Sequence, residues 1–198
     1  MKRILSIDFD YFINADLETR EHKFPDGVDD IPEEELKRQW SYFYDKYPEI
    51  NDLGVIYNYV PTCITLSSLK SGKVLVAESH RDIAKLFPLI ESEEEIEVLH
   101  VDYHHDNYVS GGNEVDCANW VRHLKDLIPN AHIKWVRRPD SETASLMGEF
   151  PYQHTEKLNI EGEFDYIFLC FSPEWTPPHF RIYFEAMKRF LSHLEHIK

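Results

Sequence analysis

The chain has 198 residues, with 36 acidic and 21 basic side chains and a formal net charge of -15. Its length suits a single domain over residues 1–198, and the acidic excess argues against nucleic acid, which is bound mainly through basic side chains. No apolar run reaches the roughly 18 residues of a membrane span, the N-terminal apolar run is too short for a signal peptide, and the three cysteines lack CxxC spacing. We therefore expect a cytoplasmic protein without a disulfide framework or a zinc ribbon.

The first half of the chain alternates between strand and helix patterns. Arg3–Ile7 is a short apolar run that predicts a strand, and the polar segment Asn14–Ile31 reads as a connection with a turn at Pro25–Gly27. Pro32 and the three glutamates after it predict the start of a helix. The apolar side chains of this helix recur at helical spacing: Leu36, Trp40, Phe43, Tyr44 and Tyr47. Residues 53–67 mix both patterns and stay unassigned.

The remaining segments continue the alternation. We predict strands at Val74–Ala77, Ile96–Val101, Ile133–Val136 and Phe164–Phe171. We predict helices at Arg81–Ile90, Asp116–Ile128, Ser141–Met147 and about His179–His196, with a glycine-containing loop at Asn107–Asn113. This alternation is typical of a three-layer α/β/α domain with a mainly parallel sheet.

Three metal-binding side chains alternate after the predicted strand Ile96–Val101: Asp102, His104 and Asp106. In an extended backbone, residues two apart point to the same side, so this strand would aim all three at one point. Charged residues also mark where a buried strand reaches water, but a triplet of Asp, His and Asp is less common there than a single Asp. The triplet therefore indicates a metal site.

Two other predicted strands also end in metal-binding residues. The first strand runs into Asp8 and Asp10, and His80 follows Val74–Ala77. Turn or helix-cap chemistry would also account for the two aspartates, and a capping or core role for the histidine. Because ligands of open α/β sheets bind at the carboxyl ends of the strands, we expect these segments to converge if the strands are parallel neighbours.

The combined set has four carboxylates and two imidazoles, which is more than one ion needs. An oxygen-rich set with a few histidines suits manganese or a similar ion better than a thiolate-lined zinc site. Two ions that share carboxylates can hold a bridging hydroxide as a nucleophile. The residues therefore predict a metal-dependent hydrolase with two ions.

Five segments of the chain carry a family resemblance. The Asp-x-His-x-Asp motif at Asp102–Asp106, the strand-end His80 and the Ser-x-Asp-x-Asp segment within Ser6–Phe12 resemble the metal signature of the arginase and deacetylase superfamily. The aromatic residues of Ser6–Phe12, the pair Asn119–Trp120 and the segment Ser172–Pro177 are similar to the branch that includes the peptide arginases. In arginases the Asp-x-Asp strand follows the Asp-x-His-x-Asp strand, whereas here it comes first. The resemblance therefore implies an arginase-like domain that is circularly permuted.

By this resemblance, the chain would bind two Mn²⁺ ions. The first ion would be held by His80, Asp102, Asp106 and Asp8, and the second by His104, Asp102, Asp8 and Asp10. A metal-bridging hydroxide would attack the guanidinium carbon of an arginine side chain, giving ornithine and urea. Asp106 would orient this hydroxide and pass its proton to the departing amine.

The resemblance also implies a substrate and the residues that bind it. It favours arginine residues in a ribosomally made precursor peptide, and the acidic surface would suit a basic segment. Glu174 is the candidate for binding the guanidinium group, although a surface turn residue is an equal interpretation, and Asn113 and Asn119 are further candidate substrate residues. His105 and His123 are both candidates for the proton shuttle, and a histidine on a helix, such as His123, is more often simply exposed.

Two other functions remain open. A zinc deacetylase would bind one ion through an Asp, His, Asp set, whereas the additional His80 argues for a second ion. Two manganese ions per chain would favour the ureohydrolase and one zinc ion the deacetylase. A non-catalytic module would keep the fold and bind a peptide, and urea release that is lost after Asp102→Ala or His104→Ala would exclude it.

Overall fold

The computed structural model describes residues 1–25, 31–90, 95–108, 114–143 and 153–197 of the chain. Over these residues the backbone forms a sheet of seven strands in the order β5-β4-β3-β1-β6-β2-β7, and neighbouring strands pair in parallel. The strands are β1 (Lys2–Asp8), β2 (Lys73–Ala77), β3 (Ile96–Val101), β4 (His132–Val136), β5 (Gln153–Thr155), β6 (Tyr166–Cys170) and β7 (Glu195–His196). The expected α/β class with a mainly parallel sheet is confirmed.

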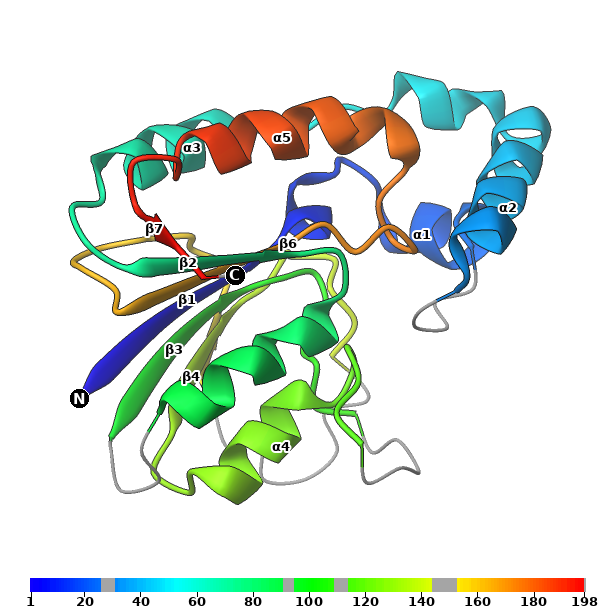
Figure 1. The fold of residues 1–198 in the computed structure, drawn as a ribbon. Helices are drawn as coiled ribbons and strands as arrows, with labels where there is room; N and C mark the ends of the chain where they lie inside the picture. The colour runs from blue at the N-terminus through cyan, green and yellow to red at the C-terminus, as the bar shows by residue number, and fades with distance from the viewer. Residues whose placement is uncertain (26–30, 91–94, 109–113, 144–152, 198) are drawn as a thin grey trace.

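Helices cover both faces of this sheet (Figure 1). On one face lie α3 (Tyr59–Ser68) and α5 (Arg181–Arg189), and on the other lie the 3₁₀ segment η3 (His80–Leu89) and α4 (Trp120–Leu127). The helices near the carboxyl ends of the strands are α1 (Leu17–Lys23) and α2 (Glu33–Lys46). Shorter 3₁₀ segments are η1 (Phe9–Phe12), η2 (Pro48–Asp52) and η4 (Pro178–Phe180). No helix in the described ranges is long and apolar enough to cross a membrane.

The central strands are apolar on both sides because both faces of the sheet are covered. Along β1, Leu5 and Ile7 pack into the core that α3 and α5 complete, whereas Ile4 packs into the core that η3 and α4 complete. Ser6 points to the same side as Ile4 and is fully buried. A buried serine in the middle of a strand normally has a hydrogen-bond partner. The partner of Ser6 is His80, which belongs to the candidate site.

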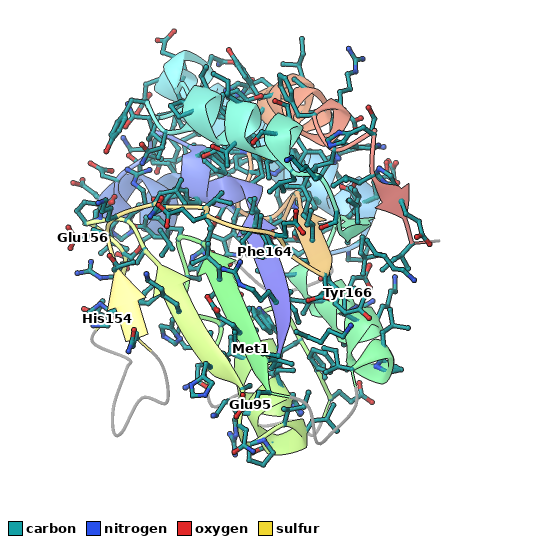
Figure 2. The ribbon with its side chains drawn as sticks, turned by 90° about the vertical axis from the view of Figure 1, so that its left-hand side faces the viewer. Met1, Glu95, His154, Glu156, Phe164 and Tyr166 are labelled. Carbon is teal, nitrogen blue, oxygen red and sulfur yellow. The ribbon has the colours of Figure 1, made fainter. Side chains whose placement is uncertain are left out.

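The register of the sheet aligns the carboxyl ends of four adjacent strands. Val101 of β3 lies opposite Ile7 of β1. Asp8 of β1 lies opposite Cys170 of β6, which in turn lies opposite Ala77 of β2. Residues that leave these strands therefore emerge at one edge of the sheet. Figure 2 shows the starts of the strands, near the labelled residues Met1, Glu95, Phe164 and Tyr166.

Two helices lie where the sequence analysis assigned none. The polar segment Asn14–Ile31 contains α1, which is capped by Asp16 because its side chain accepts a hydrogen bond from the Thr19 N–H. The unassigned residues 53–67 contain most of α3. Pro61 lies in the first turn of this helix, where its missing N–H would have no helical partner.

Other predicted helices differ from the observed ones. The helix predicted over His179–His196 is wrong beyond Arg189, because Glu195–His196 pair as β7 with the open edge of β2. The helix predicted over Arg81–Ile90 is instead the 3₁₀ segment η3 (His80–Leu89), which has Pro88 inside it. The helix predicted from Asp116 begins at Trp120. In the segment Ser141–Met147, residues 141–143 are not helical and residues 144–147 lie outside the described residues. The short strand β5 was not expected.

Candidate metal centre

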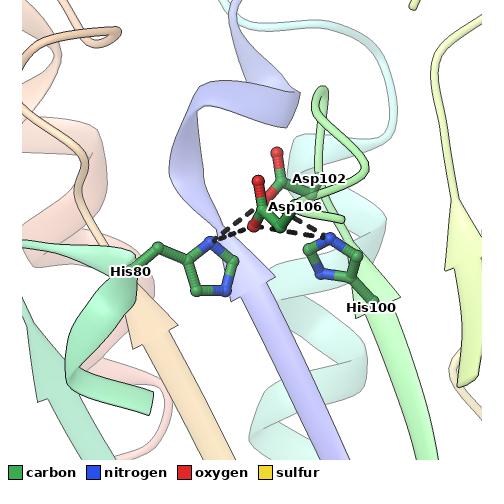
Figure 3. A group of neighbouring side chains, drawn as sticks. All are labelled: His80, His100, Asp102 and Asp106. Carbon is green, nitrogen blue, oxygen red and sulfur yellow. Dashed lines mark ion pairs between the residues drawn. The ribbon is translucent and has the colours of Figure 1, made fainter. Parts of the chain in front are cut away.

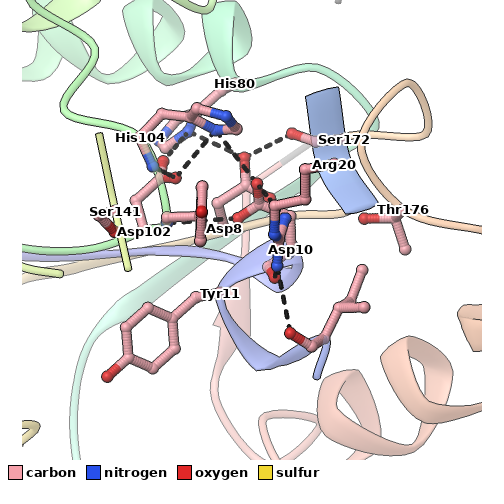
Figure 4. A network of polar contacts seen from close by, with 12 residues as sticks. Asp8, Asp10, Tyr11, Arg20, His80, Asp102, His104, Ser141, Ser172 and Thr176 are labelled. Atoms are coloured by element: carbon pink, nitrogen blue, oxygen red, sulfur yellow. Dashed lines mark hydrogen bonds and ion pairs between the residues drawn. The ribbon is translucent and has the colours of Figure 1, made fainter. Parts of the chain in front are cut away.

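One group of metal-binding side chains surrounds His80, the first residue of η3. Its Nδ1 lies 3.0 Å from Asp102 Oδ2, 3.1 Å from Asp106 Oδ2 and 3.2 Å from Asp8 Oδ2. All four side chains are buried. Asp8 ends β1, His80 follows β2, and the other two aspartates follow β3, so the three predicted strand ends do converge (Figure 4).

A second group of side chains shares Asp102 with the first. His104 Nδ1 lies 3.2 Å from Asp10 Oδ2 and 3.7 Å from Asp102 Oδ1. The backbone N–H of Tyr103 donates to Asp10 Oδ1 at 3.4 Å and helps to orient that carboxylate. Asp102 thus turns Oδ2 towards His80 and Oδ1 towards His104. The two groups could each hold a metal ion and would share this carboxylate.

The Asp102–Asp106 motif is bent rather than extended. β3 ends at Val101, residues 103 and 104 form a bend, and Asp106 has a positive φ of 52°. Such a φ is uncommon for a residue with a Cβ and is often found at functional sites. The bend turns Asp106 back to face His80, whereas His104 faces Asp10. The expectation that all three side chains aim at one point is therefore wrong: the motif divides between two groups.

His100, on β3, belongs to the first group and was not singled out in the sequence. Its Nε2 lies 3.6 Å from both Asp102 Oδ2 and Asp106 Oδ2, and its side chain is fully buried. Figure 3 shows His80 and His100 on either side of the two carboxylates. His100 precedes Asp102 by two residues and so faces the same side of the strand. This spacing was the available signal, but the apolar residues around His100 concealed it.

Neighbouring polar side chains orient two of the candidate ligands. Ser6 Oγ lies 2.9 Å from His80 Nε2. With the proton on Nε2, the ring donates to Ser6 and leaves the Nδ1 lone pair for an ion. Trp120 Nε1 donates to Asp106 Oδ2 at 2.7 Å. Partners of this kind fix the orientation of metal ligands and support their affinity.

A buried arginine stands beside the second group. Arg20 Nη1 lies 3.5 Å from Asp10 Oδ2, and Nη2 donates to the carbonyl oxygens of Asp10 at 2.7 Å and Ile13 at 3.2 Å. The guanidinium also lies over the ring of Tyr103, 3.9 Å from its centroid. Because Arg20 already pairs with Asp10, the second group carries less unpaired negative charge than the first.

The crowded carboxylates shift one another's proton affinities. Burial, together with the charges of Asp10 and Asp8, raises the pKa of Asp102 well above 3.8. Burial and the charge of Asp102 likewise raise the pKa of Asp106 well above 3.8. Burial opposes the charged form of His80, but Asp106 and Asp8 outweigh it and raise the pKa of His80 above 6.5. These shifts share one cause, a concentration of buried negative charge that divalent cations would neutralise.

The donor atoms fit a metal ion better than they fit one another. Asp102 Oδ2 is buried and forms no hydrogen bond within the described part of the chain, although His80 Nδ1 lies 3.0 Å away. Both ring nitrogens of His100 are also buried without a hydrogen bond in those residues. Unpaired buried polar atoms are rare and commonly mark a bound water or ion. Carboxylate oxygens with imidazole nitrogens suit manganese, iron or zinc.

A pocket of about 280 Å³ opens onto the first group. Its wall combines candidate ligands with aromatic side chains: Asp8, His80, Asp106, Tyr108 and Trp175. The Trp175 ring packs against the His104 ring with centroids 4.5 Å apart. Ser172, which has a positive φ of 48°, donates from Oγ to Asp8 Oδ2. The segment after β6 thus both orients a candidate ligand and forms part of the pocket.

The two candidate proton-shuttle histidines are not among the described residues that line this pocket. His105 is buried, with its ring centroid 3.9 Å from that of Tyr108 and 5.8 Å from that of Trp135. Burial lowers the pKa of His105 to about 4. His123 is partly exposed on α4. The structure therefore brings neither histidine together with the candidate ligands.

Glu174 lies beside the first pocket rather than in it. Its side chain is buried and lines a second pocket of about 460 Å³ together with Glu78 and Arg181. Its neighbours Ser172 and Trp175 line the first pocket, so one short segment serves both. Glu174 is thus placed in a pocket next to the candidate metal centre.

Of the two asparagines predicted to bind substrate, Asn119 lies in the described part of the chain, and it is not among the described residues that line the first pocket. Asn119 is buried, its Oδ1 accepts from the Asp116 N–H at 2.8 Å, and its Nδ2 donates to the Glu114 carbonyl at 3.1 Å. These bonds tie down the residues before α4, which is a structural role. Asn113 lies outside the described residues.

Comparison of the chain with protein-family models, with curated proteins and with solved structures finds no match. The described residues show an α/β protein with an all-parallel sheet and a buried His/Asp cluster that could hold metal ions. A function has to be argued from this cluster and from the pocket beside it.

Proposed function

We propose that this chain is a peptide arginase, a manganese-dependent hydrolase of the arginase and deacetylase superfamily. Its substrate would be an arginine side chain in a ribosomally made precursor peptide. Water would add to the guanidinium carbon and the bond from that carbon to arginine Nε would break. The products would be urea and an ornithine residue in the peptide.

The observation that carries this proposal is the position of Asp102 between two histidines. Its Oδ2 lies 3.0 Å from His80 Nδ1, and its Oδ1 lies 3.7 Å from His104 Nδ1. A carboxylate that offers one oxygen to each of two groups has the arrangement of a bridging ligand in a two-metal site. A zinc deacetylase needs one ion, so the second group supports the ureohydrolase.

The candidate ligands divide between two Mn²⁺ ions. The first would be held by His80, Asp8, Asp102 and Asp106, and the second by His104, Asp10, Asp102 and Asp8. When bound, the ions would supply an activated water and neutralise negative charge on the reacting atoms.

Asp106 is the residue that we assign to proton transfer. Its Oδ2 accepts from Trp120 Nε1 at 2.7 Å, which fixes the carboxylate in the wall of the first pocket. Its Oδ1 would accept the proton of the attacking water and deliver it to the arginine Nε as this becomes the amine of ornithine. General acid and base catalysis of this kind requires a carboxylate held within reach of both atoms.

The first pocket suits a planar cation. Tyr108 and Trp175 contribute aromatic rings, and Asp8 and Asp106 contribute carboxylates. Aromatic faces attract guanidinium groups, and carboxylates pair with them through two hydrogen bonds. Glu174, in the neighbouring pocket, would contact the peptide beside the reacting arginine.

The order of the strands supports the proposed circular permutation. β1, which carries Asp8 and leads to Asp10, lies directly beside β3, which leads to Asp102. An arginase-like site needs these carboxylates together, whichever strand comes first along the chain. The observed pairing meets this requirement, and we propose that residues 1–198 form a single arginase-like domain.

Incubation of the purified protein with Mn²⁺ and a peptide that contains one arginine tests this function. The expected result is urea together with a peptide lighter by about 42 Da, the mass of the carbon, two nitrogens and two hydrogens that are lost. Loss of an acetyl group also removes about 42 Da, so the peptide must lack acetyl-lysine and urea must be measured separately.

The matched variants are Asp102→Asn and Asp126→Asn. Asp102→Asn should abolish urea release, whereas Asp126, exposed on α4, should be replaceable without loss. A folded, manganese-loaded protein that binds the arginine peptide without altering it would support the non-catalytic module. Removal of acetyl groups from an acetyl-lysine peptide by a protein with one zinc ion would support the deacetylase.

A further inference from the structure

His100 is a buried polar side chain whose ring nitrogens form no hydrogen bond within the described residues. Its exposed fraction is 0%, and neither ring nitrogen has a hydrogen-bond partner in the described parts of the chain. Leaving a buried donor or acceptor unpaired destabilises a protein, whereas an apolar side chain of similar shape would avoid that cost. A histidine at this position therefore calls for a partner beyond the described residues, which a bound ion would supply.

The nitrogen of His100 that faces the cluster is well placed for an ion. Its Nε2 lies 3.6 Å from Asp102 Oδ2 and from Asp106 Oδ2, the same two oxygens that approach His80 Nδ1 (Figure 3). The four donor atoms all lie within 4.8 Å of one another. Donor atoms that share one ion at about 2.1 Å are roughly 3 to 3.6 Å apart, close to this arrangement.

Aromatic neighbours hold the His100 ring in place, while no group in the described ranges forms a hydrogen bond with its nitrogens. Trp120 packs edge-on with ring centroids 5.0 Å apart, and the His80 ring lies at 5.4 Å. Ser6 is the register partner of His100 on β1, but its hydroxyl bonds to His80 Nε2. The ring is thus fixed by aromatic packing, and its Nε2 is directed at the two carboxylates.

We propose that His100 is an additional metal ligand of the first group. This group then has two imidazoles, from His80 and His100, and three carboxylates, from Asp8, Asp102 and Asp106. The inference rests on the proposed function in one respect, that the chain binds metal ions at this cluster. It does not depend on the reaction or on the substrate.

A consequence of this assignment is that the two groups bind ions unequally. The second group has one imidazole, and Arg20 lies 3.5 Å from its Asp10 carboxylate. Imidazole ligands strengthen the binding of borderline ions such as Co²⁺ and Zn²⁺, and a nearby cation weakens the binding of a second one. The first group therefore fills before the second.

Titration of the metal-free protein with Co²⁺, followed by its visible absorption, tests the assignment. The variants are His100→Phe, which keeps a ring against Trp120, and His100→Asn, which keeps a polar group. His132→Phe is the control, because His132 is exposed at the start of β4, at the opposite end of the strands. Unfolding of each metal-free protein in denaturant shows whether the variants fold.

The wild-type protein and His132→Phe should show two binding phases, with the tighter one first. In both His100 variants the tighter phase should weaken by about 100-fold and its absorption spectrum should change, because a ligand is lost. Metal-free His100→Phe should be at least as stable as the wild-type protein, because the unpaired imidazole is gone. A purely structural role would give the opposite result, a destabilised protein.

Unchanged Co²⁺ affinity and an unchanged spectrum in folded His100→Phe would overturn the proposal and leave the proposed function untouched. Absence of Co²⁺ and Mn²⁺ binding by the wild-type protein would overturn both. The expected Co²⁺ results together with no urea release would leave His100 as a ligand and remove the arginase function alone.

Discussion

Asp102 and His80 approach within 3.0 Å through Oδ2 and Nδ1, although β1 and β6 lie between the strands that lead to them. The contact arises because the carboxyl ends of four adjacent strands are level, so residues far apart in the sequence reach one place. Asp102 also faces His104 through its other oxygen, at 3.7 Å. A change at this one carboxylate should therefore affect both candidate metal groups.

Asp102→Asn should abolish the binding of both ions, because the amide cannot act as a bridging carboxylate. The metal-free variant should be as stable as the wild-type protein or more stable by about 1 to 3 kcal/mol, since it removes a buried charge that lies among other carboxylates and whose Oδ2 forms no hydrogen bond in the described residues. Isothermal titration with Mn²⁺ and denaturant unfolding measure the two effects. One ion retained at full affinity would contradict the shared carboxylate.

The metal-free protein should become less stable as the pH rises above about 6.5, because below that pH the lowered pKa values of His100 and His105 oppose the effect of the raised carboxyl pKa values. The pKa of Asp102 and of Asp106 is raised well above 3.8 by burial and by neighbouring carboxylates, so the folded protein binds more protons than the unfolded chain in this range. The pKa of His80 is raised above 6.5, so the protein loses further stability as the pH rises through the pKa of His80 in the folded state. The pKa of Asp10 is lowered, so its contribution to the stability of the folded protein is lost only as the pH falls.

Unfolding free energies measured from pH 4 to pH 9, with and without Mn²⁺, check this expectation. Manganese should reduce the dependence of the unfolding free energy on pH, because the ion takes the place of the protons. The affinity for Mn²⁺ should increase with pH. Asp102→Asn should flatten the profile of the metal-free protein. A stability that rises between pH 6.5 and pH 9 in the absence of metal would contradict the assigned pKa directions.

Ser6→Ala should weaken metal binding without removing it. The change deletes the partner of His80 Nε2, which lies 2.9 Å from Ser6 Oγ, and leaves the ring free to turn. Loss of such a partner typically lowers metal affinity by about 10-fold to 100-fold. Ser192→Ala, at an exposed position after α5, is the control. Equal Mn²⁺ affinities in the two variants would show that Ser6 does not orient His80.

Arg20→Ala should be strongly destabilising. It removes a fully buried cation that pairs with Asp10 and donates to the carbonyl groups of Asp10, Ile13 and Ala15. Breaking a buried ion pair from one side costs about 3 to 5 kcal/mol. Arg38→Ala, which removes an exposed pair with Glu35, should change little. Similar unfolding midpoints for the two variants would contradict the role given to Arg20.

Glu174→Gln should raise the KM for an arginine peptide and leave kcat nearly unchanged. Glu174 lines the pocket next to the metal centre, so its charge would contribute to peptide binding rather than to the reaction. Loss of one charge-assisted contact corresponds to about a tenfold change. Glu163→Gln, near the starts of the strands, is the control. A fall in kcat at constant KM would place Glu174 in the chemical step instead.

The sequence predicted the strands well because their apolar runs are clear and both faces of the sheet are covered. The sequence was less informative about short elements whose formation depends on contacts with distant parts of the chain. α1 has seven residues within a polar segment, and α3 contains Pro61 near its start. β7 forms only because Glu195 and His196 can pair with an open sheet edge, which no local pattern reveals.

The candidate site was predictable in its residues, and the family resemblance also implied their division between two groups, but the bend that produces this division was not predictable. Strand-end positions identified Asp8, His80 and Asp102, because parallel strands bring their carboxyl ends together. The positive φ of Asp106, 52°, reverses the local direction of the chain and divides the motif between two groups. His100 lies within an apolar run, where only the three-dimensional arrangement shows that its nitrogens form no hydrogen bond with the described residues.

The number of manganese ions per chain tests the central claim most directly. Metal-free protein would be loaded with excess Mn²⁺, passed through a desalting column and analysed for metal, while the electron paramagnetic resonance spectrum reports whether the ions are coupled. The wild-type chain should retain two ions that give the signal of a coupled pair. The Asp102→Asn variant should retain neither ion and should give no such signal. A folded wild-type protein that retains one ion or none would contradict the central claim.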